Sequence, residues 1–145
     1  MYKRILIPTD GSRLSAKAVR AAVRLAKALG AEVEGLTCTP SFTVGALHPG
    51  LVSAVPPQYV RASRKAAHTA LDAVKHAAAQ AGVRCRTREV QADRPHEAIL
   101  RQAGRDRCDL IVMASHGRRG MSRLFLGSET ARVLARSTIP VLVCR

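Results

Sequence analysis

The stretch DLIVMAS at residues 109–115 is the least polar run in the sequence. A continuous apolar run of this length predicts a strand that is buried on both faces, as strands are in the middle of a parallel sheet. Parallel strands need long crossover connections, which helices usually supply. The run therefore predicts an α/β protein in which helices cover both faces of a parallel sheet.

On either side of this run, strand-like and helix-like patterns alternate. Short apolar or alternating runs predict four more strands, at residues 3–9, 31–38, 83–90 and 139–145. Apolar residues spaced three and four apart predict four helices, and Ser12, Gly30 and Gly82 are the residue types expected at helix ends. The predicted helices lie at residues 12–29, 57–81, 95–107 and 127–137.

This regular alternation predicts one doubly wound domain over residues 1–145, a flavodoxin-like (Rossmann-like) fold with the strand order 3-2-1-4-5. In such a sheet the first and fourth strands lie side by side, and ligands bind outside their carboxyl ends. The third and last strands fall at the sheet edges. The connection at residues 39–56 is long and rich in Pro and Gly, so we expect an exposed loop that orders over a bound ligand.

A formal net charge of +14 makes nucleic acid a candidate partner. Aromatic residues make up only 3% of the chain, however, so the stacking platforms of many RNA and single-strand binders are nearly absent. The cations lie mainly on predicted helix faces, such as Arg20, Arg24 and Lys27. We expect weak, salt-sensitive association with nucleic acid at most, and no specific binding.

Other features of the sequence indicate a cytoplasmic protein. It contains no apolar stretch of the ~18 residues that a membrane helix needs, and its first residues enter a strand pattern without a signal-peptide core. The four cysteines are widely spread and form no CxxC pair, which argues against a zinc ribbon or a redox pair. We expect most of them to be buried and reduced.

The apolar run leads directly into ASHGRRGMSRLFLGS, residues 114–128. A loop between a central strand and a helix can direct several backbone N–H groups at one anion, and glycines permit the close approach. The candidate phosphate contacts in this segment and just after it are Gly117, Gly120, Gly127, Ser128, Thr130, Arg118, Arg119 and Arg123. The residue types alone leave an alternative open, namely ordinary turn glycines beside solvated arginines. The spacing matches neither GxxxxGK[ST] nor GxGxxG, which disfavours fast phosphoryl transfer.

Residues 114–128 resemble the nucleotide-binding signature of the universal stress protein family, G-x2-G-x9-G-[ST]. Ala114 stands at the first glycine, Gly117 and Gly127 stand at the second and third, and Ser128 stands at the hydroxyl position. ILIPTDGS near the start and IPVLVCR at the end resemble the first and last strands of the family. The similarity extends over essentially the whole chain.

This resemblance implies a dimer that binds ATP or another adenine nucleotide together with Mg²⁺. The adenine and ribose side would be formed by Pro8, Thr9, Asp10 and Cys38. The ribose and phosphate side would be formed by Met113, Ala114, Ser115, His116, Gly117, Arg118, Arg119, Gly120, Gly127, Ser128, Glu129 and Thr130. Asp10 would bind a ribose hydroxyl or a metal-bound water, and Cys38 would line the adenine pocket or serve as a buried structural thiol.

Ala114 departs from the signature, because its methyl group would crowd the ribose if the position required close backbone approach or a positive φ. The last strand presents an apolar sheet edge, and pairing with a second copy would cover it. We therefore expect a homodimer through the C-terminal strand.

Catalysis would need a positioned acid, base or nucleophile. His116 could touch a phosphate, but a histidine at a strand end is more often a packing or solvent residue, and we expect slow ATP hydrolysis at most. His48, His68, His76 and His96 lack the spacing of a helical metal site, so we expect surface histidines and no protein-held metal. The sequence indicates a nucleotide-dependent stress-response sensor or regulator, with a slow ATP hydrolase or a nucleotide-independent dimeric interaction module as alternatives.

Overall fold

The computed structural model describes residues 1–41, 55–118 and 126–145. These residues form a sheet of five strands: β1 (Arg4–Pro8), β2 (Glu32–Thr39), β3 (Cys85–Gln91), β4 (Leu110–Ala114) and β5 (Val141–Cys144). All neighbouring strands are parallel, and their order is β3-β2-β1-β4-β5. The predicted flavodoxin-like α/β fold is therefore confirmed.

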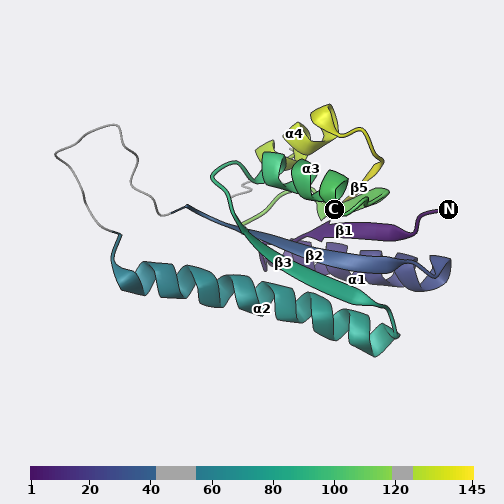
Figure 1. Ribbon diagram of the computed structural model, residues 1–145, viewed down its shortest axis with the longest axis horizontal. Coiled ribbons are helices and arrows are strands. Elements are labelled where there is room, and N and C mark those ends of the chain that lie inside the picture. The colour runs from purple at the N-terminus through teal and green to yellow at the C-terminus, as the bar shows by residue number, and fades with distance from the viewer. Residues whose placement is uncertain (42–54, 119–125) are drawn as a thin grey trace.

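Helices connect the strands and cover both faces of the sheet (Figure 1). They are α1 (Arg13–Leu29), α2 (Pro57–Ala81), α3 (Pro95–Arg105) and α4 (Ser128–Arg136). The pair α1 and α2 covers one face, and the pair α3 and α4 covers the other. α3 ends two residues before the predicted position, because Arg107 takes a positive φ of 52°.

Local sequence sets the ends of α1 and α2 as predicted. The Ser12 hydroxyl accepts a hydrogen bond from the Ser15 backbone N–H at 3.1 Å and so caps the start of α1. Gly30 and Gly82 end the two helices with φ angles of 65° and 69°, a region that glycine enters without a Cβ clash.

The side chains of β1 alternate between two hydrophobic layers. Ile5 and Ile7 pack with α1 and α2, whereas Leu6 packs with α3 and α4. All five residues of β4 are buried, as expected for a strand covered on both faces. Burial of an aliphatic side chain of this size contributes about 1.5–3 kcal/mol. The two central strands, β1 and β4, are thereby anchored in both layers.

The two edge strands differ in chemistry. β3 presents exposed Arg86 and Arg88 at one edge of the sheet. β5 lies at the other edge and carries Leu142, which is 43% exposed. Charged edges resist pairing with another strand, whereas apolar edges invite it. The two edges of the sheet are therefore not equivalent.

Several further expectations can be compared with the described residues. Of the long connection at residues 39–56, residues 42–54 lie outside them. All four cysteines are free, but only Cys108 is fully buried, because Cys38, Cys85 and Cys144 lie at strand ends. In the described ranges, none of the helices combines the length and the apolar character required to cross a bilayer.

Glu34 is a buried carboxyl group that the sequence analysis did not single out. It lies on β2 and is 3% exposed, and its Oε1 accepts a hydrogen bond from Gln102 Nε2 of α3 at 3.0 Å. Gln102 Nε2 also donates to Asp106, and Arg88 Nε lies 3.7 Å from Glu34 Oε1. Burial, together with the neighbouring Asp106 carboxylate, raises the pKa of Glu34 from 4.5 to about 7.

Glu34→Gln should therefore stabilise the protein at high pH. The folded state binds this proton more tightly than the unfolded state, so the stability from the protonated group is present below about pH 4.5 and is lost as the pH rises through about 7. Glutamine mimics the protonated form. We expect urea unfolding at pH 8.5 to show a gain on the order of 1–3 kcal/mol that disappears toward pH 4. Asp72→Asn, at an exposed carboxylate of α2, is the matched control, and a similar profile for both variants would contradict this account.

Candidate functional site

Two loops meet at the carboxyl ends of the central strands. β1 pairs with β4, and the loops that follow them, at residues 9–12 and 115–127, lead to helices on opposite faces of the sheet. Across this junction the Arg118 backbone N–H donates a hydrogen bond to Asp10 Oδ2 at 2.8 Å. The structure therefore brings together the two segments that the sequence analysis assigned to a ligand site.

The loop after β1 is organised by two polar side chains. Thr9 is buried, and its hydroxyl accepts a hydrogen bond from the Gly11 N–H at 3.2 Å and donates one to Ser15 Oγ at 3.1 Å. Asp10 Oδ1 accepts from the Ser12 N–H at 2.9 Å. Partial burial opposes ionisation of Asp10, but hydrogen bonds from Ser12 and from the Arg118 amide outweigh it and hold the pKa of the carboxyl below its ordinary value. Asp10 is thus a fixed carboxylate at neutral pH.

Gly117 and Gly127 both lie where a Cβ would clash, Gly117 with Asp10 of the loop after β1 and Gly127 with the other end of its own loop. A Cβ at Gly117 would lie 2.5 Å from Asp10 Oδ2, and one at Gly127 would lie 2.9 Å from the Cα of His116. The Gly127 N–H also donates to the Ser115 carbonyl at 2.7 Å. Gly127 has an ordinary φ of −60°, so its need for glycine is steric. Of the predicted site residues in this loop, Arg119 and Gly120 lie outside the described residues.

Ala114 fits its position without backbone strain. It is the last residue of β4 and pairs with Cys144 of β5. Arg107 is the only non-glycine residue with a positive φ in the part of the chain that the structure describes, so Ala114 does not need the conformational freedom of glycine. The Ala114 carbonyl accepts a hydrogen bond from the buried Thr130 hydroxyl at 2.9 Å. This hydroxyl therefore anchors α4 to the end of β4.

The remaining predicted site residues differ in accessibility. Pro8 and Met113 are buried, and Met113 packs in the layer under α3 and α4. His116 is half-buried, with Nδ1 3.2 Å from Ser115 Oγ. Ser128 is exposed at the first turn of α4, where the backbone N–H groups of a helix lack intrahelical partners.

Cys38 is half-buried at the end of β2. Burial, with a smaller contribution from the Glu129 carboxylate, raises the pKa of its thiol to about 11. Cys38 is therefore an uncharged thiol at neutral pH, which suits contact with an apolar ring and does not suit nucleophilic attack.

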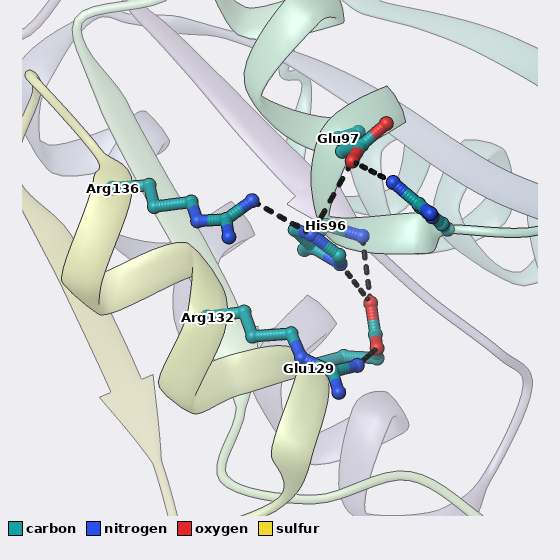
Figure 2. A network of polar contacts seen from close by, with 6 residues as sticks. His96, Glu97, Glu129, Arg132 and Arg136 are labelled. Atoms are coloured by element: carbon teal, nitrogen blue, oxygen red, sulfur yellow. Dashed lines mark hydrogen bonds and ion pairs between the residues drawn. The ribbon is translucent and has the colours of Figure 1, made fainter.

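His96 corrects a prediction, because it is 5% exposed rather than a surface histidine. It lies in the first turn of α3 and contacts the carboxylate of Glu129, whose side chain points toward α3 (Figure 2). His96 lies three residues before the buried Ile99, which lies four residues before the buried Ala103, and this helical spacing is a signal that could have revealed the burial of His96.

The site is open to solvent and lacks an evident metal cage. A groove of about 680 Å³ begins at Thr9, Gly11 and Arg118 and continues between α1 and α2. Across residues 1–41, 55–118 and 126–145, no three His, Cys, Asp or Glu side chains are grouped as metal ligands. What the junction offers a ligand is a fixed carboxylate, a helix N-terminus and closely approaching backbone.

Comparison with known proteins agrees with the family resemblance of the sequence over the whole chain. The model of the universal stress protein family matches residues 1–145. Universal stress protein YxiE of Bacillus subtilis is 35% identical over 156 residues, covering 100% of both chains. Among solved structures, universal stress protein UspA from Lactobacillus plantarum has a TM-score of 0.84 at 25% identity, covering 99% of this chain and 98% of that one. A universal stress protein in complex with cAMP has a TM-score of 0.70 at 25% identity, covering 98% and 95%.

Gly127→Ala should destabilise the protein, because the new methyl group would press on the His116 backbone at 2.9 Å and on the Ser115 carbonyl at 3.1 Å. We expect the free energy of unfolding to fall by about 1–3 kcal/mol. Gly104→Ala is the matched control, since Gly104 lies in α3 and a Cβ there would meet nothing within 4 Å. The control should be neutral or stabilising by up to about 1 kcal/mol. Equal effects in urea unfolding would contradict the packing argument.

Proposed function

Because the chain belongs to the universal stress protein family, we propose that it binds an adenine nucleotide at the carboxyl ends of β1, β2 and β4. The observation that carries this proposal is the junction of Asp10 with Gly117 and the Arg118 amide at the point where the strand order reverses. The related protein in complex with cAMP supports an adenine nucleotide as the ligand class.

The chemistry of the described groups suggests how they would share the ligand. In this proposal Pro8, Thr9 and Cys38 border the base, and the Asp10 carboxylate accepts a hydrogen bond from a ribose hydroxyl or from a metal-bound water. Ser128 and the free backbone N–H groups at the start of α4 face the phosphates. Met113, Ala114 and Thr130 form the wall behind the nucleotide, since they are buried. Ser115, His116 and Gly117 line the passage between the two sides.

We take ATP with Mg²⁺ as the ligand, because Mg²⁺ commonly binds through substrate phosphates and would neutralise part of their charge. Nucleotide occupancy would then set a conformation that a partner reads, as in a cytoplasmic stress-response regulator. The four free cysteines agree with a reducing compartment. Slow hydrolysis is the second candidate, favoured only by the half-buried His116 beside the phosphate side.

Asp10→Ala should weaken binding of ATP and Mg²⁺ to nucleotide-stripped protein by about tenfold or more in calorimetry, because it removes the fixed acceptor. Asp72→Ala, at an exposed carboxylate on α2, should leave the affinity unchanged. ADP assayed in the recovered nucleotide separates a sensor from a slow hydrolase. Absence of binding at millimolar ATP would contradict the proposed function and favour a nucleotide-independent interaction module.

We further propose a homodimer formed through β5. Leu142 of β5 is 43% exposed, and Leu134 of α4, a helix that contacts β5, is 42% exposed. An edge strand with free backbone groups and exposed leucines gains both hydrogen bonds and apolar burial from pairing with a second copy. This surface supports a dimer without any contribution from the nucleotide site.

Leu142→Lys should convert the dimer to a monomer, because it places like charges at the paired edges of both copies. Sedimentation velocity at micromolar concentration would measure the change. Tyr59→Lys on α2, at a side chain that is 63% exposed, is the matched control and should remain dimeric. A monomeric wild-type chain at this concentration would overturn the proposal.

A further inference from the structure

A polar network joins the first turns of α3 and α4 (Figure 2). One oxygen of Glu129, Oε2, accepts a hydrogen bond from the His96 backbone N–H at 2.7 Å and lies 2.9 Å from His96 Nδ1. The other oxygen, Oε1, accepts from Arg132 Nη1 at 2.6 Å. The carboxylate is therefore committed to protein groups and turned toward α3.

The geometry fixes the tautomer of His96. Arg136 Nη1 lies 3.3 Å from His96 Nε2, and a guanidinium has only donors to offer. Nε2 must then accept, so the ring proton resides on Nδ1 and is donated to Glu129. Glu97 Oε1 also lies 3.9 Å from Nε2 and is itself paired with Arg94.

Glu129 does for α3 what a local capping residue usually does. Arg94 occupies the position before α3 and makes no side-chain cap. Its carbonyl accepts from the Glu97 and Ala98 N–H groups at 3.1 and 3.3 Å, which leaves the His96 N–H to find an acceptor elsewhere. The Glu129 carboxylate supplies that acceptor from another helix, and its negative charge favours the positive end of the α3 dipole. Loss of the carboxylate would leave two buried donors of His96 without a partner.

The first turn of α4 is held from two sides. Glu129 ties it to α3, and the next residue, Thr130, ties it to the Ala114 carbonyl at the end of β4. Gly127 and Ser128 directly precede these two anchors. We propose that His96 is a positioning residue that acts through Glu129 to fix the first turn of α4, and that Glu129 does not itself contact the nucleotide. The effect on nucleotide binding rests on the proposed function, whereas the effect on α4 does not.

The position of α4 can be followed without a ligand. The Ala131 N–H donates to the Gly127 carbonyl at 2.9 Å, so its hydrogen exchange reports directly on the first turn of α4. Glu129→Ala should make this exchange about tenfold faster. Glu129→Gln should keep the wild-type rate, because its amide oxygen can accept both hydrogen bonds from His96. The Ala16 N–H, which donates to Ser12 at 3.0 Å in α1, should be unaffected.

Variants of His96 test the histidine side of its contact with Glu129. Asparagine carries a side-chain N–H near the place of Nδ1, so His96→Asn should preserve the Ala131 exchange rate, whereas His96→Leu should raise it as Glu129→Ala does. Combining His96→Leu with Glu129→Ala should raise the rate no further than Glu129→Ala alone, since loss of the carboxylate already removes both the ring contact and the backbone hydrogen bond. Glu97→Ala, one residue along α3 and paired with Arg94, is the matched control and should leave the rate unchanged.

Calorimetry with ATP and Mg²⁺ then separates positioning from direct contact. Positioning predicts about tenfold weaker binding in Glu129→Ala with full rescue in Glu129→Gln, whereas a carboxylate that touched the metal or ribose would lose binding in both variants. Unchanged Ala131 exchange in Glu129→Ala would overturn the proposal even if His96→Leu failed to fold. Absence of ATP binding by the wild type would overturn only the proposed function, because the exchange measurements would still decide the role of His96.

Discussion

Two parallel strands, β1 and β4, lie side by side in the centre of the sheet, and the chain leaves them toward opposite faces. This divergence opens a junction at their carboxyl ends, and no helix or strand within residues 1–41, 55–118 and 126–145 fills it. The contact between Asp10 and the Arg118 amide spans the junction and sets the separation of the two loops. The close packing of Gly117 against Asp10 and the proposed ligand site both depend on that separation.

Much of the fold follows from short-range signals in the sequence. The continuous apolar run of β4 identifies a central parallel strand, and Ser12, Gly30 and Gly82 mark helix ends through caps that involve only nearby residues. The buried polar groups could not be found in this way. Glu34 and His96 are buried because partners distant in sequence, Gln102 and Glu129, satisfy them, and residue type alone placed His96 on the surface.

The candidate site also combines features that the sequence predicts with features that it does not. The signature loop predicted that residues after β1 and β4 would meet, and they do. The pattern could not show that Gly127 is needed for packing against His116, or that the Thr130 hydroxyl is already bound to the Ala114 carbonyl. Such assignments depend on distances between backbone atoms after folding, which a linear spacing rule does not contain.

The few acids of this basic chain are concentrated in structural roles. The sequence has 10 acidic and 24 basic side chains. Several of these carboxylates accept backbone hydrogen bonds that join segments distant in the sequence: Asp10, Asp93, Asp109 and Glu129.

The two edges of the sheet differ in their capacity to pair with another strand. Exposed arginines oppose pairing at β3, whereas the edge at β5 is apolar. In the proposed dimer, growth of the sheet from one copy to the next would therefore stop at two, and a chain with a continuous apolar core would be protected from assembling into filaments.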